Sequence, residues 1–256
     1  MEESAQVERG AGVRIPPFEQ EALEGWGTLP GILLPRSFFE APPELVAPRL
    51  LGKILAHRTG GVVLAGRIVE AEAYLGPHHD PPDPAAHAYR GPTPRNSVLF
   101  GPAGHAYVYS IYGRYFCMNV SCETEGRAGC VLLRALEPLG GEDGADLARM
   151  ARNRGLAPGA IDPAGLRRQL ASGPGRLCQA LGITRQGHNG LDLTDPASPL
   201  QIRDDGYRVT EVLATARIGI REAADWPLRF ILAGNRCVSG ARSAIGRRVP
   251  LPVEFG

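Results

Sequence analysis

Runs of apolar residues along the chain predict a core made mainly of β-strands. Residues 61–73 (GVVLAGRIVEAEA) are rich in Val, Ile and Leu and stop at a Tyr-Leu-Gly turn, which is typical of a strand. Tyr112, Gly113 and Arg114 separate two further short runs and predict a tight hairpin tip. The remaining predicted strands are 106–111, 115–121, 131–135, 200–203, 209–220 and 228–232.

Helical spacing of apolar residues is confined to shorter stretches. It predicts a helix over 44–55 (ELVAPRLLGKIL), which Pro48 should shorten or kink, and two more over 146–154 and 175–181. Strands and helices do not alternate regularly, which argues against a parallel α/β fold. The pattern predicts an α+β fold: a single domain with a curved, mostly antiparallel, open-barrel-like β-sheet surrounded by helices, with a protruding β-hairpin.

Two segments stand apart from this pattern. Residues 1–30 mix Glu, Gly and Pro with little periodicity and predict a disordered N-terminal leader, so that residues 31–256 form the single folded domain. Residues 77–95 contain six prolines and predict a long structured loop. Loops of this length inside a compact domain are usually functional.

Composition places few limits on the partner of the protein. Residues 1–30 carry six glutamates and two arginines (−4), so the overall net charge of +1 leaves +5 on residues 31–256. This modest basic bias permits nucleic-acid binding without requiring it. No apolar run approaches 18 residues and the N-terminus lacks a signal-peptide pattern, so we expect a cytoplasmic protein with no membrane partner.

Cysteine usage bears on metal binding. The five cysteines include no Cys-x-x-Cys pair, which disfavours a zinc ribbon and predicts reduced, buried thiols. His78 and His79 resemble a metal cluster, but adjacent histidines on a loop rarely face one ion. We therefore expect no metal.

Tyrosine, histidine and carboxylate side chains are concentrated in one part of the chain. Six of the seven tyrosines and four of the six histidines lie between Tyr74 and Tyr115, and Glu72 lies two residues before this window. Structural needs alone do not gather these side chains. The window therefore predicts a concave site that stacks flat rings and moves protons.

The strand at the start of this window carries two carboxylates. Side chains alternate along a strand, so Glu70, Glu72 and Tyr74 share one face, with the carboxylates about 7 Å apart. Arg134, the only charge in the apolar run VLLRAL, is the expected partner of a buried carboxylate. A buried Arg–Glu pair is about as often structural as catalytic, and the pattern leaves both interpretations open.

The hairpin favours a catalytic interpretation that involves nucleic acid. Tyr107 and Tyr109 share one strand face, while Tyr112 occupies the exposed tip, a poor position for a core residue. Apolar wedges open stacked bases from the minor groove. Pockets lined with tyrosine and histidine hold an extruded base by stacking and edge hydrogen bonds.

Five segments of the chain occur in the order found in one known family. They are RIVEAEAYLGP (67–77), AAHAYRGPTPRN (85–96), YVYSIYGRYFCMNVS (107–121), CVLLRALEPL (130–139) and GPGRLCQALGI (173–183). With LPRSFF (34–39) and PLRF (227–230), they make residues 33–256 resemble the alkyladenine (3-methyladenine) DNA glycosylase family in its bacterial form. Residues 76–85 depart from the family pattern and are somewhat longer.

The resemblance implies a role for three residues at the reacting bond and the DNA. Glu72 matches the general base that activates the water attacking the anomeric carbon of the sugar. Arg134 matches the arginine that holds this water with it. Tyr112 matches the residue that intercalates into the space left by the flipped nucleotide.

The resemblance also implies a pocket for the flipped base. Tyr74, His87 and Tyr109 match the groups that sandwich the base, and Tyr107 lines the same pocket. Asn119 matches the asparagine placed against the purine 2-position, where it disfavours the exocyclic amine of guanine.

The implied activity is excision of damaged purines from double-stranded DNA by a monomeric, nucleoid-associated enzyme that needs no cofactor, with residues 31–256 as its catalytic domain. Strand cleavage by a glycosylase requires an amine, and Lys53 is the only lysine and lies outside the matched segments. We therefore expect a monofunctional enzyme. Two alternatives are a duplex-binding module without the chemistry, and a nucleoside or RNA N-glycosidase. An intact Glu72/Arg134 pair disfavours the first, and a Tyr112 wedge disfavours the second.

Overall fold

The computed structural model describes residues 26, 29–140, 144–157, 163–240 and 246–250. The predicted leader falls almost entirely outside these residues, so the division into leader and catalytic domain stays a prediction. Trp26, near the end of the leader, is buried in a small cluster with Ile54 and Ala56. None of the helices in the described residues is long and apolar enough to cross a lipid bilayer.

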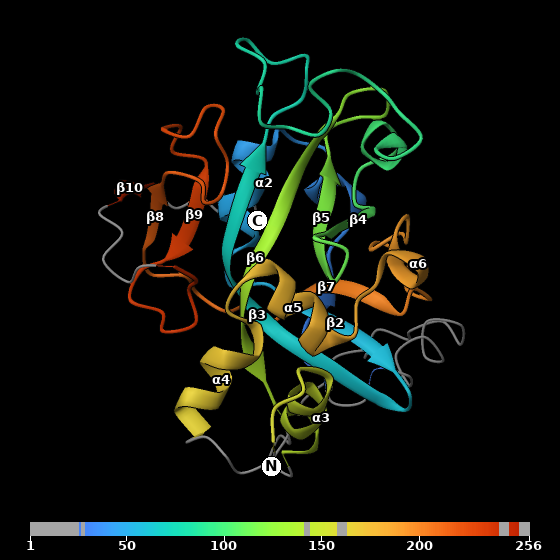
Figure 1. The fold of residues 1–256 in the computed structure, drawn as a ribbon, viewed down its shortest axis with the longest axis vertical. Coiled ribbons are helices and arrows are strands. Elements are labelled where there is room, and N and C mark those ends of the chain that lie inside the picture. Colours follow the sequence, from blue (N-terminus) through green and yellow to red (C-terminus); the bar gives the residue numbers. More distant parts are fainter. Residues whose placement is uncertain (1–25, 27–28, 141–143, 158–162, 241–245, 251–256) are drawn as a thin grey trace, which may run out of the picture.

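One large sheet of ten strands forms the centre of the described part (Figure 1). Its main path runs, in spatial order, through β1 (Ile32–Leu33), β7 (Leu200–Asp204), β2 (Ile54–Thr59), β3 (Val62–Tyr74), β6 (Gly129–Leu139), β5 (Tyr115–Cys122) and β4 (Ala106–Ile111). A branch leaves β3 through β9 (Arg229–Leu232), then β8 (Val212–Thr215) and β10 (Arg247–Val249). Every described pairing is antiparallel and the two ends of the main path do not meet, which confirms the predicted α+β fold with an open antiparallel sheet.

Short helices pack around this sheet. α2 (Pro43–Leu50) packs against β3, and α5 (Pro174–Leu181) packs against β5. The other helical elements in the described residues are η1 (Arg36–Phe38), η2 (Ser97–Phe100), α3 (Ala145–Asn153), α4 (Pro163–Ala171) and α6 (Arg185–His188).

The predicted helix over 44–55 is wrong in its second half. α2 ends at Leu50, and after a turn at Gly52 the chain enters β2 at Ile54. Ile54 packs in the Trp26 cluster, whereas Leu55 packs in the main core, so the two neighbours face opposite sides of the sheet. Two apolar neighbours on a strand buried on both faces were therefore mistaken for helical spacing.

Two strand boundaries and two short helices also differ from the predictions. The strand expected over 209–220 is reduced to β8, because residues 216–220 leave the sheet as a loop. β6 extends well beyond 131–135, because β3 pairs along it from Tyr74 to Ala65. The short helices α4 and α6 were not predicted, since one or two turns give little periodic signal.

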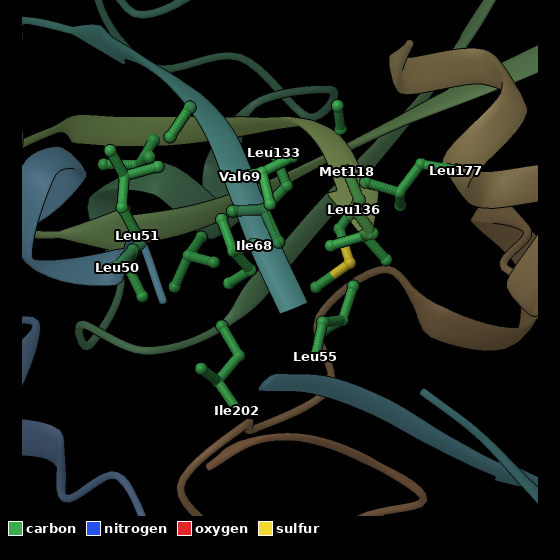
Figure 2. Close-up of a cluster of buried hydrophobic side chains, with 14 of the residues drawn as sticks. Leu50, Leu51, Leu55, Ile68, Val69, Met118, Leu133, Leu136, Leu177 and Ile202 are labelled. Carbon is green, nitrogen blue, oxygen red and sulfur yellow. The ribbon is translucent and has the colours of Figure 1, made fainter. Parts of the chain in front are cut away.

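The core lies along β3 and β6. Figure 2 shows Ile68 and Val69 of β3 beside Leu133 of β6, with Met118 of β5 facing Leu177 of α5. Ile68 and Val69 both reach the core because the pairing of β3 with β6 shifts register between residues 68 and 70. From the bulge onward, the alternation of β3 directs its small apolar residues into the core and its carboxylates to the opposite face.

Candidate active site

Glu72 is a fully buried carboxylate on the central strand β3. Its Oε2 accepts hydrogen bonds from Arg134 Nη1 at 3.1 Å and from the Tyr74 hydroxyl at 3.0 Å. Its Oε1 accepts one from the backbone N–H of Ile218 at 2.8 Å. A carboxylate has about four acceptor positions, so among the described residues one position on Oε1 remains for a further donor.

Glu70 lies two residues earlier on the same face of β3 and accepts four hydrogen bonds, one more than Glu72. Its Oε1 accepts from Arg134 Nε at 2.8 Å, Arg229 Nε at 2.7 Å and the Ser239 hydroxyl at 2.9 Å. Its Oε2 accepts from the backbone N–H of Ser239 at 2.6 Å. The expected common face of the two carboxylates and their contact with Arg134 are both confirmed.

Arg134 connects the two carboxylates. It lies on β6 at a position that the pairing skips, since Ala71 pairs with Leu133 while Glu70 pairs with Ala135. Burial by itself would lower the pKa of Arg134, but the charges of Glu72 and Glu70 outweigh burial and raise it above its ordinary value. The guanidinium is therefore a permanent charge beside Glu72.

Tyr74 is fixed by Glu72 on one side and by a buried ion pair on the other. Burial raises the pKa of its hydroxyl, and the charge of Glu72 raises it further, so the phenol stays protonated and donates to the carboxylate. The Arg217 guanidinium lies 4.6 Å from the centre of the Tyr74 ring. Arg217 in turn binds both carboxylate oxygens of Asp83, with Nη2 at 2.9 Å from Oδ1.

His87, Tyr107 and Tyr109 form a cluster of three rings. His87 approaches Tyr109 edge-on with a centroid separation of 4.5 Å, and Tyr107 lies 5.5 Å from Tyr109. The Tyr107 hydroxyl is 2.9 Å from His87 Nδ1. Asn96 holds the backbone at His87, since its Nδ2 donates to the backbone carbonyl of His87 at 2.9 Å.

Titration of this ring cluster is shifted toward the neutral forms. Burial lowers the pKa of His87, and the nearby charge of Arg95 lowers it further. Burial also raises the pKa values of Tyr107 and Tyr109. At neutral pH the cluster therefore offers uncharged aromatic faces.

Asn119 lies at the base of the ring cluster. It is buried on β5 directly opposite Tyr107 of β4, and its Nδ2 donates to the Tyr107 carbonyl at 3.2 Å. Cys117, two residues earlier on β5, pairs with Tyr109 in the same way. Burial raises the pKa of the Cys117 thiol, which is therefore protonated at neutral pH.

Tyr112 is the most exposed of the tyrosines and occupies the tip of the β4–β5 hairpin. Its side chain is 92% exposed, and its backbone φ of +50° is unusual for a residue other than glycine. Ile111 and Tyr115 close the hairpin below it, which confirms the predicted protruding hairpin. An aromatic residue with a positive φ and an almost fully exposed side chain is a candidate for a functional contact.

The structure also places the residues considered for metal binding and for amine chemistry. No group of three or more potential ligands converges anywhere in the described residues. His79 Nε2 lies 3.3 Å from Glu123. Lys53 Nζ binds Asp204 at 2.5 Å, and its carbonyl accepts from Ile68, four residues before Glu72 on β3. Four residues of strand span about 13 Å, so the amine lies away from Glu72.

Several residues that hold this site were missed by sequence reasoning. Arg229 lies in the matched segment PLRF, which was a signal without an assigned role. Ser239 and Ile218 follow strands far from β3 in the chain and showed no local signal. The Asp83–Arg217 pair joins the proline-rich loop to the loop after β8, which spacing along the chain cannot reveal.

Comparison with known proteins agrees with the motifs. Residues 37–236 match the family model for methylpurine-DNA glycosylase (MPG). A relative from Koribacter versatilis, provisionally named 3-methyladenine DNA glycosylase, is 53% identical over 82% of this chain and 94% of its own length. Relatives with the same provisional name from Methanoculleus marisnigri and Burkholderia cenocepacia are 50% and 46% identical, over 80% and 83% of this chain and 98% and 93% of their own. The chain belongs to the methylpurine-DNA glycosylase family.

Proposed function

We propose that the protein is a monofunctional base-excision-repair DNA glycosylase. It flips alkylated or deaminated purines out of duplex DNA and excises them by hydrolysis, leaving an abasic site. The substrate class comprises 3-methyladenine, 7-methylguanine, hypoxanthine and ethenoadenine. It acts as a monomer and needs no cofactor.

The environment of Glu72 is the observation that carries this proposal. A buried carboxylate beside a permanent guanidinium charge, with one acceptor position left, suits a general base that orients water. The water oxygen forms a bond to the anomeric carbon, the N-glycosidic bond breaks, and Glu72 takes the proton of the water. The negative carboxylate also stabilises the oxocarbenium-like sugar at the transition state, as in glycoside hydrolysis.

The neutral ring cluster supports the purine specificity. Tyr74, His87 and Tyr109 supply aromatic faces, with the buried Tyr107 behind them, and a cationic alkylated purine gains roughly 0.5–2 kcal/mol against such a face. The amide of Asn119 donates to the Tyr107 carbonyl, which supports a fixed side chain for the role that we propose against the purine 2-position. There it disfavours the exocyclic amine of guanine.

Tyr112 supports action on duplex DNA rather than on free nucleosides, because only a duplex needs a plug in the space left by the flipped base. Tyr112→Ala should weaken binding to a lesion-containing duplex by about 10–100-fold, given a stacking contribution of about 1–3 kcal/mol. Excision from a single strand should change far less. Binding by fluorescence anisotropy and single-turnover excision on both substrates test this, with Tyr207→Ala as the control for loss of an exposed tyrosine. An equal loss on duplex and single strand contradicts the wedge.

The position of Lys53 supports a hydrolytic enzyme without lyase activity. An excision assay over duplexes with each of the four lesions, read before and after alkali, should show strand breaks only after alkali. Lys53→Gln should excise bases as the unchanged protein does, because its amine forms an ion pair with Asp204 and takes no part in the chemistry. Breaks before alkali, lost in Lys53→Gln, contradict the monofunctional assignment. Failure to release any of the four bases contradicts the proposed function itself.

The unfavourable burial of the Glu72 carboxylate disfavours the alternative of a duplex-binding module without chemistry. A buried carboxylate is unfavourable unless it is paired, and a module that only binds DNA gains nothing from one with an unused acceptor position. The same excision assay separates the two functions.

A further inference from the structure

Four charged side chains meet in the interior beside the candidate site. Glu70, Glu72, Arg134 and Arg229 are all at least 93% buried, and each carboxylate contacts at least one guanidinium. Their formal charges sum to zero. Only Glu72 and Arg134 have a role in the proposed chemistry, so the other two need an explanation.

Glu70 is less suited than Glu72 to serve as a base in this arrangement, because more donors bind it. Both of its oxygens are occupied, three donors reaching Oε1 and the Ser239 backbone N–H reaching Oε2. These four donors equal the roughly four acceptor positions of a carboxylate, whereas Glu72 receives three donors. The function of Glu70 must therefore lie in the side chains that it binds.

What Glu70 holds is the orientation of Arg134. Its Oε1 binds Nε of the guanidinium, the Ser239 hydroxyl lies 3.5 Å from Nη2, and Nη1 then points to Glu72. The guanidinium is planar, so contacts on two of its nitrogens leave little freedom for the third. Without Glu70, Arg134 could turn both of its terminal nitrogens onto Glu72.

Arg229 makes this use of Glu70 electrostatically possible. Its Nε binds Glu70, while Nη1 binds the Thr215 hydroxyl at 3.0 Å and Nη2 binds the Ser239 carbonyl at 2.8 Å. With Arg229 present, the negative charge of Glu70 is balanced locally. The positive charge of Arg134 is then available to Glu72.

We propose that Arg229, Glu70 and Ser239 are positioning residues for the hydrolysis. They hold Arg134 with one nitrogen on Glu72 and set the charge that Glu72 experiences. This inference rests on the proposed function, because it takes Glu72 as the general base. None of the three contacts the substrate.

Other titratable and charged groups face Glu72 and are unchanged by the test. Tyr74 on β3 donates to it, Cys117 on β5 is a neutral thiol, and Arg217 on the loop after β8 is balanced by Asp83. Variants of Glu70 and Arg229 therefore alter the local charge without altering these neighbours.

The test is the pH profile of the rate of single-turnover base release. Its acidic limb is the low-pH range in which the rate falls as the charged cluster takes up a proton. Arg229→Gln leaves one excess negative charge, so the cluster takes up a proton more readily and the limb moves to higher pH by about one unit. At the wild-type midpoint the rate then falls about fivefold, by the same titration. Glu70→Gln leaves one excess positive charge and moves the limb to lower pH. The double variant Glu70→Gln/Arg229→Gln restores the balance and returns the limb to its wild-type position.

Matched controls separate positioning from a purely structural role. Arg229→Lys keeps the positive charge but loses the planar guanidinium that donates from three nitrogens. The acidic limb should therefore stay in place while the rate of base release falls. Arg248→Gln removes an arginine from an exposed ion pair and should change neither quantity. If Arg229→Gln does not fold, as shown by thermal unfolding, Glu70→Gln, the double variant and Arg229→Lys carry the same comparison. Limbs that all stay in place, or all move in one direction, overturn the proposal.

Glu72→Gln, measured in parallel, distinguishes this inference from the proposed function. Base release retained in Glu72→Gln rejects Glu72 as the base, and the positioning role is rejected with it. Base release lost in Glu72→Gln, together with unmoved limbs in the other variants, rejects only the positioning role.

Discussion

Glu72→Gln is expected to abolish base release while binding to lesion-containing DNA stays intact. The amide keeps the size of the carboxylate and can still accept a hydrogen bond from Ile218 N–H, so the fold around it persists. It loses the negative charge and cannot take a proton from water. General-base contributions are typically 10²–10⁴-fold, and loss of the charge beside the sugar adds to this, so the single-turnover rate should fall by at least about 10³-fold.

The measurement is single-turnover excision from a hypoxanthine duplex, with affinity measured in parallel by anisotropy. Glu222→Gln is the matched control, because it makes the same chemical change at an exposed carboxylate outside the site. It should excise bases at the wild-type rate. Wild-type turnover in Glu72→Gln would reject Glu72 as the general base, whereas loss of DNA binding would indicate a damaged pocket.

Asp83→Asn is expected to lower the free energy of unfolding by about 3–5 kcal/mol, because it leaves the Arg217 guanidinium buried without a counter-charge. Both side chains of the pair are fully buried. The same substitution loosens the proline-rich loop, since Asp83 also accepts from the backbone N–H groups of Leu75 and Ala85. Urea unfolding followed by circular dichroism measures the loss.

Burial of the partner is what makes this effect large, and the chain offers an exposed pair as a control. Glu211→Gln breaks the pair with Arg248, whose side chain is 82% exposed, and should cost less than about 1 kcal/mol. The double variant Asp83→Leu/Arg217→Met should recover much of the lost stability, because an apolar pair leaves no unbalanced charge. Similar losses in Asp83→Asn and Glu211→Gln would show that the buried pair does not anchor the loop.

Much of the fold could be predicted because it depends on neighbours in the chain. Strand alternation placed Glu70 and Glu72 on one face, and the short segment around Gly113 predicted the hairpin. Side chains alternate between the two faces of a strand, so about ten consecutive residues are enough to predict which of them share a face. The family followed from five ordered segments, and the comparisons confirm it.

The failures have one physical cause. Ile54 and Leu55 were assigned to a helix because nothing local shows that β2 is buried on both faces. Residues 216–220 were assigned to a strand because nothing local shows that they cross to Glu72. In both cases the deciding contact comes from another part of the chain.

The sequence by itself determined which chemical groups are available and in what order: a carboxylate pair on a strand, a tyrosine two residues later, and a tyrosine at a hairpin tip. Only the tertiary structure decided which donors reach each carboxylate. Glu70 binds Arg229 and Ser239, which lie 159 and 169 residues away in the chain, and so receives four donors where Glu72 receives three. The donors that bind a carboxylate are those that the fold brings within about 3 Å of its oxygens. No spacing along the chain encodes that distance.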